Sequence, residues 1–278
     1  WYLEKHLRLF TPSEIDKVSS RKGTVVHAVL EEFVKTFGKP VTDENINEAY
    51  DRIREIAREK FDAEKLETPE WKAAAAWYCD DGDDERGHFR PFYAFLENEK
   101  ELAKDGWETS SSGTEYTLKE TIEYDGFSFQ CNATIDRVIE RDAKESDAKE
   151  SDGEKSGGEK PREFCIIDYK SGKELPDEKR AVQLPLYAAA YQKKSGLTPA
   201  AGIYFHINEK KTEVKPAGAK KEQEKFSTVM ERGLQMAAEA AAGIQNAEFR
   251  PVPDPDVCRY CPYDRFCKSA VKSSRGGA

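Results

Sequence analysis

Apolar residues in the first 105 positions recur at three- and four-residue steps, which is typical of helices that bury one face. The segment Trp1–Phe10 is apolar-periodic, and Thr-Pro-Ser-Glu at 11–14 is typical of a helix start. One helix is predicted from Gly23 to Gly38, and others are predicted near 46–61, 69–80 and 86–104. This part of the chain is therefore expected to be mostly α-helical.

The pattern changes after Trp107, where apolar and polar residues begin to alternate. Strands are predicted over 114–124 and 127–139, joined at Asp125 and Gly126, a pair typical of a tight hairpin turn. The elements predicted next are an apolar strand at 164–170, a helix near 179–194, a strand at 202–207, a short strand near Thr212 and an Ala-rich helix over about 219–246. Strands and helices in this order predict an α/β fold with a mixed central sheet flanked by helices.

One stretch breaks this pattern because it has almost no apolar residues. Between Glu140 and Glu163 the chain reads ERDAKESDAKESDGEKSGGEKPRE, with AKESD repeated in tandem. Such a composition predicts a disordered acidic insertion at about 141–162. We therefore expect a mostly helical part at 1–105 with the histidine motif, a core at 106–250 containing the insertion, and a Cys-rich tail at 251–278.

The bulk composition bounds the class of protein. The 278 residues include 35% charged residues and carry a net charge of −9. No run of about 18 apolar residues and no basic-then-apolar leader occurs, which predicts a cytoplasmic protein without a membrane partner. The acidic balance argues against a nucleic-acid partner, but acidic residues concentrate in the insertion, and metal-dependent nucleases need carboxylates.

The candidate chemistry begins at the strand that ends Asp168-Tyr169-Lys170. Side chains alternate along a strand, so Asp168 and Lys170 project from one face. Asp136 lies at the end of another predicted strand, and two carboxylates on adjacent strands suit Mg²⁺ or Mn²⁺. Lys170 could then orient an attacking water in metal-assisted phosphodiester hydrolysis. The alternative for an isolated Asp-x-Lys is a surface ion pair.

Two helical pairs add to this set. His27 and Glu31 are one turn apart, as are Gln183 and Tyr187, so each pair shares a helix face. Taken alone, His27 is explained as a packed core residue, and Gln183 with Tyr187 as a polar rim. Their order along the chain, together with the acids, is what makes them candidates.

Four segments in this order resemble the RecB-type branch of the PD-(D/E)XK nuclease superfamily: GTVVH (Gly23–His27), TIDRV (Thr134–Val138), IDYKSG (Ile167–Gly172) and QLPLY (Gln183–Tyr187). The resemblance covers about 27–267 and implies a restriction-endonuclease-like core. One departure is Ala133, where many relatives have glycine.

The resemblance also implies roles for individual residues. His27, Asp136, Asp168 and the backbone carbonyl of Tyr169 would be metal ligands, and Lys170 would be catalytic. Gln183 and Tyr187 would support the site and contact DNA. Glu115, and with it Glu31, would be accessory acidic residues.

The tail adds three cysteines, Cys258, Cys261 and Cys267, within ten residues. Thiolates at this spacing bind zinc or an iron–sulfur cluster, both of which usually take four ligands. The segment resembles the 4Fe–4S segment of AddB/AdnB-like helicase–nuclease subunits and CRISPR-associated exonucleases, where a fourth cysteine precedes the histidine motif. Here no cysteine precedes Cys79, so the fourth ligand would be Cys79, another group, or a residue outside this sequence.

The function expected is a DNA exonuclease acting on single strands or duplex ends, as the nuclease module of a helicase–nuclease. The sequence has no G-x-x-x-x-G-K-[ST] pattern, so a helicase motor would lie in another domain or subunit. Two alternatives are a catalytically inactive nuclease fold used for DNA binding or docking, and a zinc-binding interaction protein in which the Asp-x-Lys pair is incidental.

Overall fold

The computed structural model describes most of the chain. The described residues are 14–79, 90–143, 161–172, 182–208, 225–248, 253–258, Cys261 and Cys267. The predicted Trp1–Phe10 segment, the strand near Thr212 and most of the tail lie outside these residues, as does 144–160 of the expected insertion. No helix in the described part is long and apolar enough to cross a membrane.

A four-stranded mixed sheet forms the centre of the fold, in the order β1-β2-β3-β4. Its strands are β1 (Glu108–Tyr124), β2 (Phe127–Asp142), β3 (Arg162–Lys170) and β4 (Thr198–His206). The first three run antiparallel to their neighbours, whereas β3 and β4 are parallel. This confirms the predicted fold class.

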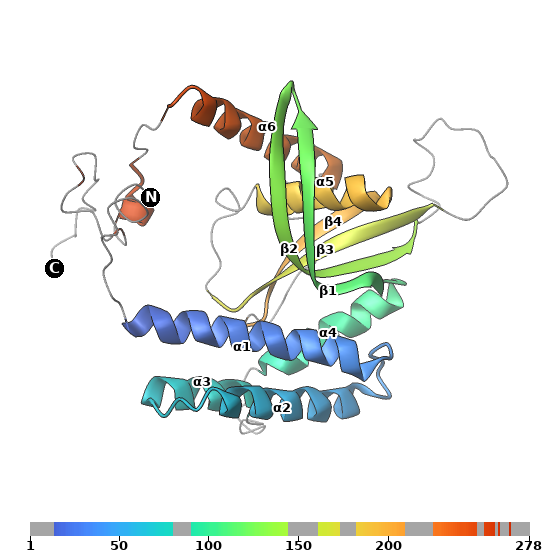
Figure 1. Cartoon of the computed structure of the whole chain (residues 1–278). Coiled ribbons are helices and arrows are strands. Elements are labelled where there is room, and N and C mark those ends of the chain that lie inside the picture. The colour runs from blue at the N-terminus through green and yellow to red at the C-terminus, as the bar shows by residue number, and fades with distance from the viewer. Residues whose placement is uncertain are drawn as a thin grey trace, which may run out of the picture.

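Helices cover both faces of the sheet (Figure 1). One layer holds α1 (Glu14–Phe37), α2 (Ile46–Ala63), α3 (Pro69–Cys79) and α4 (Pro91–Lys104), and the other holds α5 (Gln183–Ser195) and α6 (Phe226–Gln245). The short helix α7 (Pro255–Cys258) follows near the C-terminus. Strand β3 lies between the layers: Phe164 and Ile166 pack towards α5 and α6, whereas Ile167 and Tyr169 join the core of the first layer. Burial on both faces explains why this strand is continuously apolar.

The β1–β2 hairpin matches the predicted turn but is longer than predicted. Asp125 and Gly126 both have positive φ, 48° and 77°, as a type I′ turn requires. From this turn the two strands run back alongside α5 and α6 (Figure 1). Strand β2 continues to Asp142, so the prediction that Asp136 ends its strand is wrong.

The edges of the expected insertion are also ordered strand. Arg141 pairs with Glu163 at 2.6 Å and Arg162 with Glu140 at 3.3 Å, across β2 and β3. These cross-strand charge pairs extend the ladder into residues whose polarity alone predicts a loop. The insertion expected at about 141–162 therefore overlaps the two strands by a few residues, because β2 ends at Asp142 and β3 begins at Arg162.

Helix α1 is continuous from Glu14, so the predicted start at Gly23 is also wrong. A Cβ atom at Gly23 would lie 3.1 Å from Ser171 Oγ, just beyond β3. Glycine costs a helix interior about 1 kcal/mol relative to alanine. Its presence here is explained by this close approach, which a larger residue would obstruct.

Candidate active site

Strands β2 and β3 place Asp136 and Asp168 opposite each other. The register pairs Arg137 with Ile167, so the two aspartates are one step further along the same ladder. The Tyr169 N–H donates to Asp136 Oδ2 at 2.7 Å. The adjacency required for two carboxylates to act together is therefore present.

His27 reaches these strands from the middle of α1. Its Nδ1 lies 3.5 Å from Asp136 Oδ2, and its ring meets the Tyr169 ring edge-on at 6.1 Å between centroids. Burial disfavours the charged imidazole, but the contact with Asp136, helped by Asp168 and Glu115, outweighs burial and raises the pKa of His27. The side chain is half-buried and directed to the carboxylates rather than packed as an apolar core residue.

Glu115 joins the site through an irregularity in β1. The register shifts between Thr109 and Thr114, and Glu115 itself has a φ of 50°, a left-handed conformation that costs a non-glycine residue about 1 kcal/mol. Burial, and then the charges of Asp136 and Glu31, raise the pKa of Glu115. One ligand atom each from His27, Glu115 and Asp136 lies within 4.8 Å of the others.

Asp168 is held by two neighbours. Its Oδ2 contacts the Lys170 ammonium, and its Oδ1 accepts a hydrogen bond from Gln183 Nε2 at 2.8 Å. Burial, and then the charge of Asp136, raise the pKa of Asp168 despite Lys170. Gln183 also donates to the Tyr187 hydroxyl at 3.5 Å, so the first turn of α5 supports this carboxylate.

The donor set fits a divalent cation. Two ligands on one Mg²⁺ lie about 3 to 4 Å apart, given bonds of about 2.1 Å, so atoms that now lie within 4.8 Å of one another need to approach by about 2 Å at most. The Tyr169 carbonyl points to the same side as its N–H, because the two groups of an extended residue share a direction. Successive residues of a strand direct their backbone groups to opposite sides. The carbonyl of the next residue, Lys170, accordingly faces the other way and accepts a hydrogen bond from the Ile207 N–H at 3.1 Å. Glu31 forms an ion pair with Lys35 and does not belong to this group of three.

Sequence reasoning missed the buried network next to Asp136. Arg137 donates to Glu99 at 2.7 Å, to Thr109 at 2.8 Å and to the Tyr169 hydroxyl at 3.4 Å. Burial opposes the charge of Arg137, but Glu99 and Tyr169 outweigh it and raise its pKa. The available signal was an arginine inside an apolar strand, since a buried arginine requires partners.

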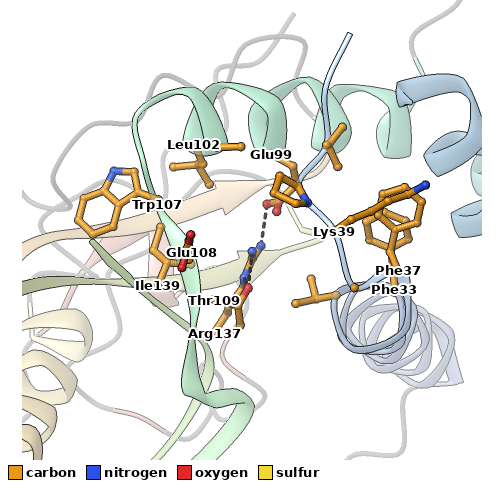
Figure 2. Close-up of a pocket in the computed structure, with 15 residues that line it drawn as sticks. Phe33, Phe37, Lys39, Glu99, Leu102, Trp107, Glu108, Thr109, Arg137 and Ile139 are labelled. Atoms are coloured by element: carbon orange, nitrogen blue, oxygen red, sulfur yellow. Dashed lines mark hydrogen bonds and ion pairs between the residues drawn. The ribbon is translucent and has the colours of Figure 1, made fainter. Parts of the chain in front are cut away.

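This network lines a cavity of about 340 Å³ between α1, α4 and the sheet. Figure 2 shows the guanidinium of Arg137 directed at Glu99 inside the cavity. Its larger apolar lining residues are Phe33, Phe37, Leu102, Trp107 and Ile139. The cavity contains none of the predicted ligands, so it is separate from the carboxylate site.

The tail cysteines are not brought into a ligand group within the described residues. Cys258 and Cys261 are half-buried, Cys267 is exposed, and Cys79 is buried in the helical core. In the part of the chain that the structure describes, the group with metal-ligand spacing is His27, Glu115 and Asp136. A 4Fe–4S cluster therefore stays a prediction.

Comparison with known proteins identifies the fold family. The model of the PD-(D/E)XK nuclease superfamily matches residues 1–268. The chain belongs to the PD-(D/E)XK nuclease superfamily. The Gene 69 protein of Mycobacterium phage D29 is 28% identical over 272 residues, which cover 92% of this chain and 89% of that protein. The Gene 69 protein of Mycobacterium phage L5 is 30% identical over 106 residues, or 38% of this chain and 34% of that protein.

Superfamily membership supports the general class expected from the sequence. PD-(D/E)XK nucleases bind DNA and generally use Mg²⁺ or Mn²⁺. The two carboxylates of this group, Glu115 and Asp136, are ligands of the kind that such cations prefer.

Proposed function

We propose that this PD-(D/E)XK protein is a DNA exonuclease of the RecB-type branch, and the nuclease module of a helicase–nuclease. The observation that carries the proposal is the convergence of His27, Glu115 and Asp136 beside the Asp168–Lys170 pair. The order of the four motif segments supports the branch. Exonuclease action and a helicase partner rest on that resemblance.

Each residue has a defined task in this proposal. His27, Asp136, Asp168 and the Tyr169 carbonyl hold the metal, with Glu115 as an additional carboxylate. When bound, the cation supplies a Lewis acid that activates water and offsets charge on the phosphate. Lys170 orients the attacking water, and its contact with Asp168 fixes the ammonium beside that carboxylate. Gln183 holds Asp168 in place, and Tyr187 contacts DNA.

The test is cleavage of end-labelled and circular DNA with Mg²⁺ or Mn²⁺. The parent protein should degrade end-labelled DNA and leave closed circles intact, whereas Asp168→Ala and Lys170→Ala should bind DNA without cutting it. The matched controls are Asp51→Ala and Lys194→Ala, which change exposed residues on α2 and α5. Cleavage by both site variants at the parental rate would exclude the assignment. A parent that binds DNA but never cuts it would be an inactive docking module.

The cysteines need a separate test. We propose that Cys258, Cys261 and Cys267 supply three ligands of a structural 4Fe–4S cluster, since the tail resembles cluster segments of RecB-type nucleases. Anaerobically purified protein should then be brown, with absorbance near ~400 nm. If the protein were colourless and held stoichiometric zinc, the cysteines would form a zinc site instead of a cluster. The nuclease assignment would be unchanged.

A further inference from the structure

We propose that Asn208, two residues beyond the end of β4, is a positioning residue for Lys170. Its side-chain amide holds the chain at Ser171, directly after the lysine, and thereby fixes the end of β3 against the end of β4. This inference rests on the proposed nuclease function, in which Lys170 orients the attacking water. It adds a residue from outside the predicted metal ligands, which acts on the lysine through the backbone.

The amide of Asn208 joins two parts of the fold through three hydrogen bonds. Its Nδ2 donates to the Ser171 carbonyl at 2.8 Å. Its Oδ1 accepts from the Tyr78 hydroxyl at 2.9 Å and from the Trp77 indole N–H at 3.2 Å. Because Trp77 and Tyr78 lie near the end of α3, the amide ties the residue after β3 to a helix of the first layer.

An amide suits these neighbours because they make opposite demands. An indole N–H can only donate a hydrogen bond, and a backbone carbonyl can only accept one, so the group between them must supply both an acceptor and a donor. A carboxylate would supply the acceptor alone and would oppose the Ser171 carbonyl. The same neighbours fix the orientation of the amide, with Oδ1 towards Trp77 and Nδ2 towards Ser171.

The bond to Ser171 extends the pairing of β3 and β4 by one step. The register of these parallel strands ends with Lys170 opposite His206, and the Ile207 N–H donates to the Lys170 carbonyl at 3.1 Å. One residue further along both segments, the Asn208 amide donates to the Ser171 carbonyl. Because the ends of elements open more readily than their interiors, a bond at this place holds the last residue of β3, which is Lys170.

Ser171 is confined by α1 as well. Gly23 of that helix approaches so closely that a Cβ atom there would lie 3.1 Å from Ser171 Oγ. The residue after Lys170 is thus held by a hydrogen bond from Asn208 and by a close contact with α1. Removing the hydrogen bond leaves the close contact, which limits movement in one direction only.

The ammonium of Lys170 depends on this alignment because its neighbours come from both strands. It contacts Asp168 of β3 and lies 5.3 Å from the centre of the Tyr204 ring of β4. Asp168 and Tyr204 are themselves partners in the β3–β4 register. A shift of the end of β3 would move the ammonium relative to Tyr204, and misplacing a reacting group by about 1 Å can reduce a rate about 100-fold.

Steady-state kinetics of Asn208→Asp test the proposal. This variant keeps the size of the side chain and an oxygen that accepts from Trp77 and Tyr78, but a carboxylate cannot donate to Ser171. DNA cleavage should lose about 100-fold in kcat with little change in KM, because the lysine is misplaced while DNA binding is retained. Asn208→Gln, which keeps an amide, should retain more of kcat. The control is Asn246→Asp, the same change at an exposed position directly after α6.

Tyr78→Phe separates positioning from a contribution to stability alone. It removes the hydroxyl that donates to Asn208 Oδ1 and leaves the bond to Ser171 in place. Both Tyr78→Phe and Asn208→Asp should lower the thermal midpoint, whereas only Asn208→Asp should lower kcat strongly. If the two variants lost kcat in proportion to their loss of thermal midpoint, Asn208 would be a structural residue and the proposal would be overturned.

Hydrogen exchange measured by NMR gives a readout that does not depend on cleavage. In EDTA, Asn208→Asp should lose protection at the Ile207 amide, which donates to the Lys170 carbonyl. Protection at the Tyr169 amide, which donates to Asp136, should stay as in the parent. Protection factors are compared because they correct for the changed neighbour of Ile207. Unchanged protection at Ile207 would show that Asn208 does not hold the end of β3.

The outcomes distinguish this proposal from the proposed function. If the parent cleaves DNA and Asn208→Asp does so with the parental kcat, the positioning role is excluded and the nuclease assignment stands. If the parent cleaves nothing, the nuclease assignment falls, and exchange at Ile207 still decides whether Asn208 holds the end of β3. Should Asn208→Asp fail to fold, Asn208→Ala removes the donor without placing a charge beside Ser171, and the same two measurements decide.

Discussion

Two groups of charged residues lie side by side on β2 and β3, and they are built on opposite principles. In the Arg137 group, the buried guanidinium is matched by Glu99, Thr109 and the Tyr169 hydroxyl. In the carboxylate group, Glu115 and Asp136 lie close to His27, and Asp168, in contact with Lys170, is near enough to Asp136 for their charges to interact. Neighbouring residues of one strand thus take part in a balanced network and in an unbalanced one.

The difference shows which group supports the fold and which performs chemistry. A balanced buried network holds strands in place and needs nothing further. Burial, and then the charge of Asp136, raise the pKa of both Glu115 and Asp168, and a cation that binds among these carboxylates is favoured. We therefore expect the carboxylate group to govern activity and the Arg137 group to govern stability.

The largest effect is expected from Asp136→Asn. Cleavage should fall by about 1000-fold, because a metal ligand and its charge are lost. The thermal midpoint of the metal-free protein should stay equal or rise, since asparagine can still accept from the Tyr169 N–H and repulsion with Asp168 is relieved. Activity assays and calorimetry measure the two effects, and Asp51→Asn is the control. A large loss of stability would show that Asp136 belongs to the structural group instead.

Arg137→Met is expected to have the opposite profile. Removing the guanidinium leaves the half-buried Glu99 without its charge partner, which should cost about 3 kcal/mol of unfolding free energy. The double variant Arg137→Met with Glu99→Gln should recover part of that loss. Urea denaturation measures both. If the single variant were as stable as the parent, the balanced network would not support the fold.

Metal should stabilise the parent protein measurably. Mg²⁺ or Mn²⁺ at about 100 times its dissociation constant should add about 2.7 kcal/mol and raise the thermal midpoint by about 5 °C or more. Asp136→Asn should show little of this shift, whereas Arg137→Met should retain it from its lower starting point. Equal shifts in parent and Asp136→Asn would place the cation elsewhere.

The smallest effect is a pH dependence of the metal-free protein. Glu115 and Asp168 have raised pKa values in the folded state, so that state binds protons more tightly than the unfolded chain. Their contribution to stability is present at low pH and is lost as pH rises from the unfolded value near ~4 through the folded pKa. The pKa of His27 is also raised in the folded state, so its contribution to stability is likewise lost as the pH rises above 6.5, the usual pKa of histidine. Denaturation in EDTA across this range should show a shallower decline for Glu115→Gln than for the parent.

Local patterns were enough to predict the sheet, most helices and the hairpin turn. Asp125 and Gly126 adopt the backbone that their sequence favours, and the Asp-x-Lys pair lies on one strand face because alternation is a local rule. Long-range contacts decided the rest. Gly23 was interpreted as a helix start, but the glycine is explained by its close approach to Ser171. Because Ser171 is nearly 150 positions away along the chain, no local pattern reports this contact.

The site was predicted more completely in residue types than in geometry. The identities of His27, Asp136 and Asp168 came from motif order, but the central place of Glu115 depends on an irregular register in β1. A shift of register is set by the partner strand, and no local pattern reports it. Arg137 was missed for the same reason, since its partners come from α4, β1 and β3.

The hydrogen bond from the Tyr169 N–H to Asp136 ties the chemistry to strand alignment. If β3 slipped by one residue against β2, Asp168 and Lys170 would turn to the opposite face, and Asp136 would lose its main-chain donor. A misaligned molecule could look well folded by its secondary structure and still be inert. The specific activity of a preparation would then be proportional to the fraction of molecules with the correct strand register. A nuclease assay would therefore measure how much of the protein is correctly folded.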